Sequence, residues 1–236
     1  MPNEPVEIKV NIAQPAEAVD TLQLTDGENR RIYFLEDQTP GLASRYPLLT
    51  AGVVLRLRAE VDGAGDCTVK LRPSRRTQLV DEWRVADDTA DGWTYRIEGD
   101  WAGDRRVLSA SLVTDLTANE ISAALTAPEK AISARHLSFI RACTGLPLEP
   151  AALTVLGPVT AMKWSKVRVG DVRKVNAERW KVGGLDFLEL SRKVDGGQAA
   201  AALAELATAA VSSGLTLDTD KRSKTEQVLD ALAGPN

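Results

Sequence analysis

The sequence predicts an α+β fold in which short antiparallel strands form a sheet and helices flank it. Three observations support this prediction. Most of the chain before residue 195 alternates apolar and polar residues, as half-buried strands do. Turn-forming Gly and Asp residues separate these segments. Helix-start signals gather in two stretches, at about 117–150 and 198–234. The chain of 236 residues is long enough for one such domain, and we expect a single domain over 1–236.

Nine segments carry the strand pattern. Turns such as Asp62–Gly65 and Gly183–Gly184 join several of them closely, and short connections favour antiparallel pairing. The predicted strands are 6–12, 30–36, 53–61, 67–73, 93–101, 106–116, 162–169, 176–182 and 186–194.

The helical connection at about 117–150 contains two Ser/Thr-x-x-Glu capping boxes, in which two side chains satisfy backbone donors at a helix start. These are Thr117 with Glu120 and Thr126 with Glu129, and Gly145 is a helix stop for the second. The same signals predict two C-terminal helices. One covers the alanine-rich segment 198–213, and the other begins at Ser223 with Glu226.

Composition excludes several classes of protein. The formal net charge of −4 argues against binding of duplex nucleic acid through a basic surface. The N-terminus has no apolar run of a signal peptide, and the apolar segment 199–211 is too short to span a bilayer. Cys67 and Cys143 lack metal-ligand spacing and fit a reducing compartment. We therefore expect a cytoplasmic protein without membrane partners.

The polar faces of the predicted strands separate charges by sign. Arg56 and Arg58 on one segment, and Lys70 and Arg72 on the next, alternate with leucine and valine. Acids gather on other segments, as Glu7, Glu98, Asp100 and Glu189. On any single strand this face could simply meet solvent, but a solvated face normally mixes signs. Segregated cations and carboxylates suit phosphate oxygens and a divalent metal, respectively.

The order of these motifs resembles the CYTH, or triphosphate tunnel metalloenzyme, superfamily. The matching stretches are VEIKV, RRIYFLEDQTPGL, VVLRLR, TVKLR, YRIEGD, KVRV and FLELSRK, which span residues 6–194. The resemblance implies a closed antiparallel β-barrel of eight strands whose interior binds a triphosphate. It also implies Mg²⁺ or Mn²⁺ as cofactor and a triphosphatase activity on a small-molecule triphosphate or polyphosphate.

The resemblance also implies roles for individual residues. Lys9, Glu98 and Glu189 would be catalytic. Phosphate oxygens would be bound by Lys9, Arg56, Arg58, Lys70 and Arg72, with Arg96, Lys166 and Arg168 as further cations of the interior. The metal-side carboxylates would be Glu7, Glu98, Asp100 and Glu189. His136, the single histidine, is predicted to be non-catalytic.

The sequence departs from the family pattern at two positions. Pro5 stands where the first glutamate of Glu-x-Glu-x-Lys is expected, and Ser191 stands where a second late glutamate often occurs. Two alternatives to a triphosphatase therefore stay open: a triphosphate- or polyphosphate-binding module without catalysis, and an ATP-cyclising enzyme. The oligomeric state cannot be predicted from these residues.

Overall fold

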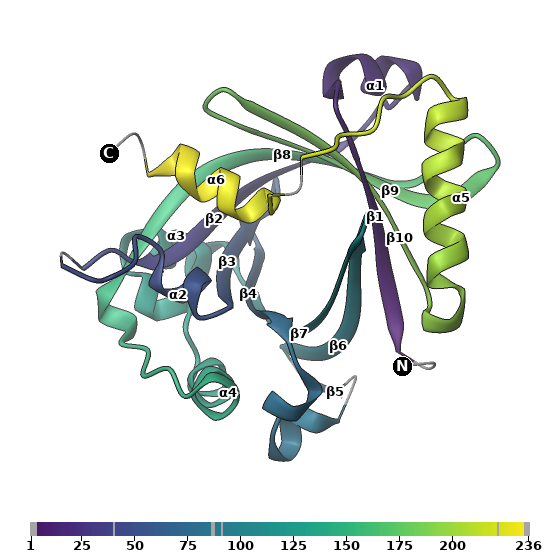
Figure 1. Cartoon of the computed structure of the whole chain (residues 1–236). Helices are drawn as coiled ribbons and strands as arrows, with labels where there is room; N and C mark the ends of the chain where they lie inside the picture. The colour runs from purple at the N-terminus through teal and green to yellow at the C-terminus, as the bar shows by residue number, and fades with distance from the viewer. Residues whose placement is uncertain (1–3, 40, 86–87, 91, 221, 234–236) are drawn as a thin grey trace. The chain divides into compact units, whose positions relative to one another are not determined.

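The computed structural model describes residues 4–39, 41–85, 88–90, 92–220 and 222–233 (Figure 1). These residues form ten strands and six α-helices. They are β1 (Pro5–Ile12), α1 (Pro15–Thr21), β2 (Glu28–Asp37), α2 (Pro47–Thr50), β3 (Val53–Ala59), β4 (Gly65–Ser74), β5 (Asp88–Ala90), β6 (Trp93–Ala102), β7 (Arg105–Leu116), α3 (Ala118–Thr126), α4 (Ala134–Thr144), β8 (Leu153–Val169), β9 (Val172–Val182), β10 (Leu185–Asp195), α5 (Ala199–Ser212) and α6 (Lys224–Leu232).

All nine predicted strands are present, and the α+β class is confirmed. The strands pair in the order β1-β10-β9-β8-β2-β3-β4-β7-β6-β5, and β1 also pairs with β6. This additional pairing joins the first strand of the order to the ninth, so the hydrogen-bonded ladder closes as it does in a β-barrel. Within the described residues the short β5 pairs only with β6, and it was not predicted.

The predicted count of eight antiparallel strands is wrong in detail. Nine strands form the closed ring, and β1 and β6 run parallel, with Val6 opposite Gly99. The odd number explains the parallel junction: strand direction cannot alternate all the way around a closed ring of nine, so at least one neighbouring pair must be parallel. The sequence pattern predicted the segments but contained no information about how the ring closes.

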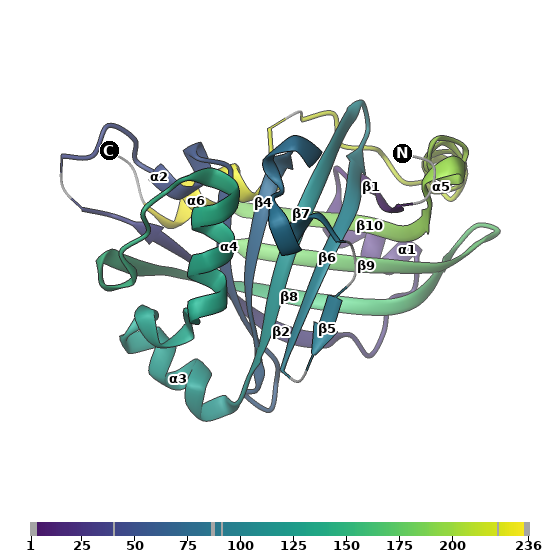
Figure 2. The same ribbon diagram turned by 90° about the horizontal axis from the view of Figure 1, so that it is seen from below.

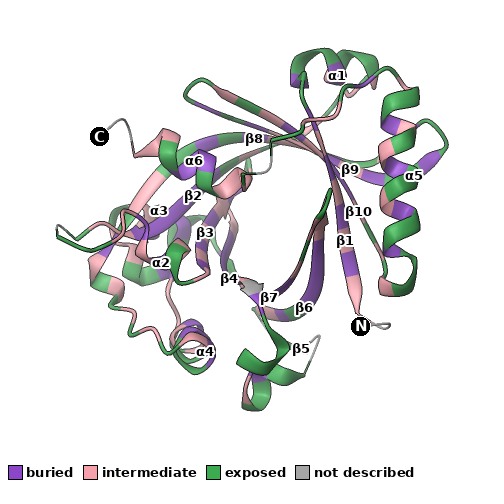
Figure 3. Ribbon diagram, in the orientation of Figure 1, coloured by how far each residue is buried: buried purple, intermediate pink, exposed green. Residues whose placement is uncertain are grey.

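The chain divides into two compact units. Unit 1 contains residues 1–30, 98–107 and 159–236, and unit 2 contains residues 31–97 and 108–158. In unit 1, α5 packs along β1, β9 and β10. Ile8, Leu190 and Leu206 lie in the resulting apolar core (Figure 1). Buried and half-buried positions alternate along β1, as Figure 3 shows, so its other face carries the polar residues.

Unit 2 has its own apolar core, built on the leucine and valine faces of β3, β4 and β7. Helices α3 and α4 cover these faces (Figure 2). Trp83, Tyr95 and Phe139 form an aromatic cluster in this core, with ring centroids 4.7–5.4 Å apart. Cys67 is fully buried here, and burial raises the pKa of its thiol to about 12. It is therefore a core thiol that stays protonated at neutral pH.

Three of the predicted helix starts are confirmed, and one is wrong. The Thr117–Glu120 capping box opens α3, Ser223 accepts the Glu226 backbone N–H at the start of α6, and α5 matches the predicted alanine-rich helix. Thr126 does not open a helix; it is the last residue of α3. The next residue, Ala127, precedes a proline and is not helical (φ −141°, ψ 82°), because proline disfavours the helical region for the residue before it. No helix in the described residues is long and apolar enough to cross a membrane.

Helix α4 begins later than predicted, at Ala134, and ends at Gly145 as expected. Ser133 and His136 form its capping box: the Ser133 N–H donates to His136 Nδ1 (3.2 Å), and the His136 N–H donates to Ser133 Oγ (3.2 Å). Nε2 of the same ring is 3.1 Å from Thr114 Oγ1. His136 is fully buried, and this burial lowers its pKa to about 4.

This buried histidine makes stability depend on pH. Its pKa is about 6.5 in an unfolded chain and about 4 in the fold, so the neutral ring stabilises the protein above pH 6.5. That contribution is lost as the pH falls from 6.5 to 4, and amounts to about 3 kcal/mol. We expect His136→Gln, which keeps a Ser-x-x-Gln capping box, to remove this part of the acid sensitivity. Urea unfolding at pH 7 and pH 4 measures it; an equal pH dependence in both proteins would contradict the assignment.

Candidate functional site

On the polar face of unit 1, three carboxylates surround the ammonium group of Lys9. Lys9 Nζ lies 3.1 Å from Glu7 Oε2, 3.4 Å from Asp100 Oδ1 and 3.9 Å from Glu189 Oε1. Asp100 is completely buried, and the side chains of Lys9 and Glu189 are only 11% and 15% exposed. Oxygen ligands from β1, β6 and β10 therefore converge on one cation.

Strand register explains why these residues meet. Glu7 lies opposite Asp100 in the parallel β1–β6 pair, and Lys9 lies opposite Ser191 in the antiparallel β1–β10 pair. Residues that face each other across a ladder share one side of the sheet. The opposite side carries Ile8 and Leu190 and is covered by α5. The apolar residues thus determine which face of the sheet holds the charges.

Two further lysines complete this charged cluster. Lys224, the first residue of α6, lies 3.7 Å from Glu189 Oε2 and 4.1 Å from the ring centroid of Trp180. Lys193 donates to Glu98 Oε2 at 2.7 Å. Glu189 therefore bridges two ammonium groups, and Glu98 is bound by a third. Glu98 and Glu189 lie on polar strand faces, as predicted, whereas Lys193 and Lys224 were not among the predicted site residues.

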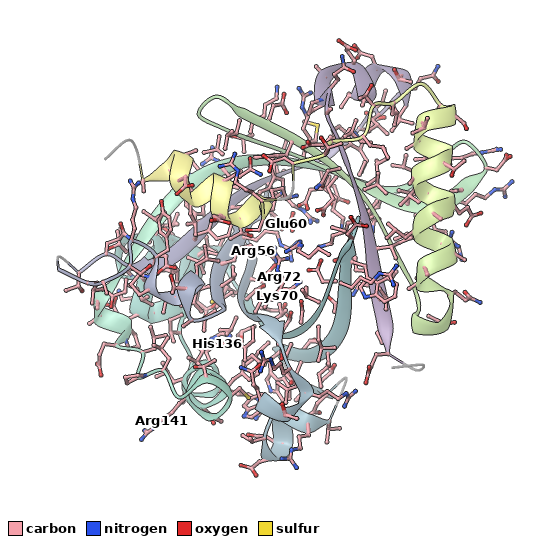
Figure 4. The ribbon with its side chains drawn as sticks, in the orientation of Figure 1. Arg56, Glu60, Lys70, Arg72, His136 and Arg141 are labelled. Carbon is pink, nitrogen blue, oxygen red and sulfur yellow. The ribbon has the colours of Figure 1, made fainter. Side chains whose placement is uncertain are left out.

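The four predicted arginines and lysines of β3 and β4 lie together in unit 2. Val54 pairs with Lys70 and Arg56 pairs with Thr68, which puts both cations on one side of the sheet. Figure 4 shows Arg56, Lys70 and Arg72 gathered on the side of β3 and β4 away from α3. All three are half-buried. The expectation that this row shares one face is therefore met, and the face is the one opposite the helices of unit 2.

Arg58 belongs to the same row but has an acidic neighbour that the sequence analysis missed. Its Nε and a terminal nitrogen lie 2.8 and 2.7 Å from Asp66 Oδ2, and Thr68 donates to Asp66 Oδ1. Asp66 precedes Thr68 and Lys70 in the alternation of β4, so the same period-two reading could have found it. The row is not purely cationic.

The other three predicted phosphate-binding residues are exposed. Arg96 lies on β6 and is exposed. Lys166 is an exposed residue of β8 with a positive φ of 60°. Arg168, also exposed, donates to the Gly170 carbonyl and to Asp171 at the β8–β9 turn. The structure does not bring Lys166 or Arg168 to the carboxylates around Lys9.

Pro5 and Ser191, the two departures from the family pattern, lie on β1 and β10. Pro5 is the first residue of β1, where a missing N–H is tolerated. Ser191 lies directly opposite Lys9. On the neighbouring strand, Glu178 pairs with Glu189 and adds a carboxylate to the same face, one that the sequence analysis did not select.

The donor chemistry of this cluster suits a hard divalent cation, because carboxylate oxygens from three strands approach one point. In this structure, however, the carboxylates surround the ammonium group of Lys9. Within the described residues, no group of three His, Cys, Asp or Glu side chains is arranged to hold a metal ion. A metal bound here would replace or share the position that Lys9 now occupies among the carboxylates.

Comparisons with known proteins identify the fold. No protein-family model and no curated protein sequence matches the chain. A solved structure of a candidate adenylyl cyclase from Hippeastrum, described as having a dominant triphosphatase activity, is similar with a TM-score of 0.62 and 12% identity, over 96% of this chain and 95% of that one. A candidate adenylate cyclase from Bacillus halodurans gives a TM-score of 0.61 and 12% identity, over 96% and 98%.

A protein from Pyrococcus horikoshii is similar at a TM-score of 0.52 and 14% identity, over 94% of this chain and 98% of that one. Identities this low establish a shared fold and nothing further. The comparisons thus show that this chain has the same fold as the two candidate cyclases, one of which is described as having a dominant triphosphatase activity.

A substitution of Lys9 tests whether the three carboxylates depend on its ammonium group. Lys9→Met would leave three carboxylates without their shared cation, so we expect the free energy of unfolding to fall by about 3 kcal/mol. Mg²⁺ or Mn²⁺ should then raise the melting temperature more in the variant than in the wild type, because a divalent ion can replace the ammonium. Thermal unfolding with and without metal measures both effects.

Lys181→Met is the matched control, since Lys181 is an exposed cation on the opposite face of β9. It should change neither stability nor the response to metal. A Lys9→Met protein as stable as the wild type would show that the three carboxylates do not depend on Lys9.

Proposed function

We propose that this protein hydrolyses a triphosphate, either inorganic triphosphate or a small organic one. The observation that carries the proposal is the convergence of Glu7, Asp100 and Glu189 on Lys9. Together with the cationic row of β3 and β4, this gives the charged groups that phosphoryl transfer needs. A fold shared with a protein described as a triphosphatase is consistent with it.

The chemistry rests on charge compensation. Lys9, Arg56, Arg58, Lys70 and Arg72 are proposed to bind phosphate oxygens, with arginine donating in a bidentate fork and lysine acting as a point charge. Such groups position a polyphosphate and stabilise the negative charge that spreads over its oxygens during transfer. Because Arg58 is already bound to Asp66, a phosphate must compete with that carboxylate for it.

We further propose Mg²⁺ or Mn²⁺ as the cofactor, with Glu7, Glu98, Asp100 and Glu189 as the residues that would hold it. Such an ion supplies positive charge to phosphate oxygens and to a water molecule. Lys9, Lys193 and Lys224 now lie against these carboxylates and would have to shift toward the phosphates on binding. Lys9, Glu98 and Glu189 are accordingly proposed as catalytic residues.

A binding module without catalysis is the second candidate. It is favoured by the lysine paired with each of these carboxylates and by Ser191, which lies opposite Lys9 where an acid would add a ligand. In that case the protein would bind triphosphate tightly in EDTA and release no phosphate with either metal. Isothermal titration calorimetry with tripolyphosphate distinguishes this candidate from the enzyme.

The activity is tested by phosphate release from tripolyphosphate, ATP and thiamine triphosphate in Mg²⁺ or Mn²⁺. We expect turnover that EDTA abolishes and that falls about a hundredfold in Lys70→Ala and in Glu98→Ala. Arg141→Ala is the control, because Arg141 is an exposed cation that points outward from α4 (Figure 4).

Equal rates in the wild type and in the Lys70 and Glu98 variants would rule out the proposed site. Formation of cyclic AMP from ATP, with no release of inorganic phosphate from tripolyphosphate, would instead identify an ATP-cyclising enzyme. Pyrophosphate is the second product of that reaction and can be measured in the same assay.

A further inference from the structure

The hairpin that joins β8 and β9 concentrates positive charge outside the carboxylate cluster. Residues 163–174 contain five lysines and arginines and a single acid, a net charge of +4 in a chain of net charge −4. Figures 1 and 2 show this hairpin projecting beside α5, within unit 1. Gly170, in its turn, lies against Ala209 of α5 and against Ser213 at the end of that helix, so the helix supports the tip of the hairpin.

Two bulges place the cations on one face of this hairpin. Trp164 pairs with Ala177, Val167 with Val175 and Val169 with Val172. Between these pairs one strand and then the other has an extra residue, and the left-handed residues Lys166 (φ 60°) and Lys174 (φ 58°) take up the excess. All four valines therefore stay on the side of α5, in or against the apolar core of unit 1.

The cations Lys166, Arg168, Arg173 and Lys174 lie next to these valines in the sequence and outside the apolar core. All four are exposed. Arg168 forms an ion pair with Asp171, whereas in the described part of the chain Lys166, Arg173 and Lys174 lie in no salt bridge. Glu205, the one acidic residue of α5, is paired with Arg192. A row of four exposed cations, of which Arg168 alone is paired with an acid in the described residues, is thus presented to solvent.

This cationic face continues the polar face that carries the carboxylate cluster. The last pair of the β9–β10 ladder is Ser191 with Asn176. Two residues beyond it on either strand lie Lys193, which binds Glu98, and Lys174 of the hairpin. Positive charge therefore extends from the edge of the cluster along the hairpin, in the direction that a long anionic chain would follow.

We propose that this hairpin face binds linear inorganic polyphosphate, so that the substrate class includes chains longer than three phosphates. The inference rests on the proposed function, because it assumes that the reacting end of the chain is bound at the carboxylate cluster. Evenly charged phosphate units need only a row of cations. Single-stranded RNA, the other extended phosphate polymer, is bound through stacking on aromatic side chains as well. The cationic face offers none, since Trp164 is packed in the core of unit 1.

The test compares two double variants of equal charge. Arg173→Gln/Lys174→Asn removes two cations of the face, and asparagine tolerates the positive φ of Lys174. Arg141→Gln/Lys181→Gln removes two exposed cations elsewhere. Calorimetry in EDTA with long-chain polyphosphate, with tripolyphosphate and with 5′-triphosphorylated single-stranded RNA measures binding without turnover.

We expect the hairpin variant to raise the dissociation constant of long-chain polyphosphate about fivefold, and to leave that of tripolyphosphate unchanged. The control variant should change neither. The proposal is overturned if the wild type binds the long chain no more tightly than tripolyphosphate, if both double variants weaken binding equally, or if the hairpin variant weakens RNA binding and not that of polyphosphate. Because turnover is not measured, a protein without triphosphatase activity can still pass this test, so the two proposals fail separately.

Discussion

The period-two alternation of β-strands is the constraint on which the rest of this structure depends. A strand has two faces, and when valine and leucine on one face are buried under helices, every charged residue of that strand must share the other. In unit 1, α5 covers Ile8 and Leu190, so Lys9 and Glu189 lie on the uncovered side. In unit 2, α3 and α4 cover the leucines of β3, which leaves Arg56 on the opposite side.

Once charges are gathered on a half-buried face, they must compensate one another. A carboxylate as buried as Asp100 is costly unless a cation or several donors lie close to it. Lys9 provides that cation for three strands at once, and Lys193 and Lys224 do the same for Glu98 and Glu189. These lysines stabilise the protein as it stands, and in the proposed function they would turn toward the phosphates. A ligand of higher negative charge would then replace the ion pairs between the lysines and the carboxylates.

Local patterns predicted a large part of the fold. The strand predicted at 186–194 is β10 (Leu185–Asp195), and Thr117 with Glu120 marked the start of α3. The patterns failed where a local rule was overridden by another. Thr126 resembled a helix start, but Pro128 prevents Ala127 from becoming helical, and α4 begins instead at a Ser133–His136 box that a search for glutamate cannot find. The short elements α1, α2 and β5 were also missed, because segments of three to seven residues are too short to show a clear periodic pattern.

The sequence by itself determined which residues of each strand share a face, because that depends only on their spacing. In this way the spacing placed four charged residues on the polar faces of their strands: Arg56, Lys70, Glu98 and Glu189. Only the tertiary structure decided which faces meet. Lys9 and Asp100 are 91 positions apart, and Glu98 and Lys193 are 95 apart. Their contacts follow from strand order, from the parallel β1–β6 junction and from two bulges that keep Lys166 and Arg168 on an exposed hairpin. Register between distant strands arises from packing of the whole core, and no short stretch of sequence contains it.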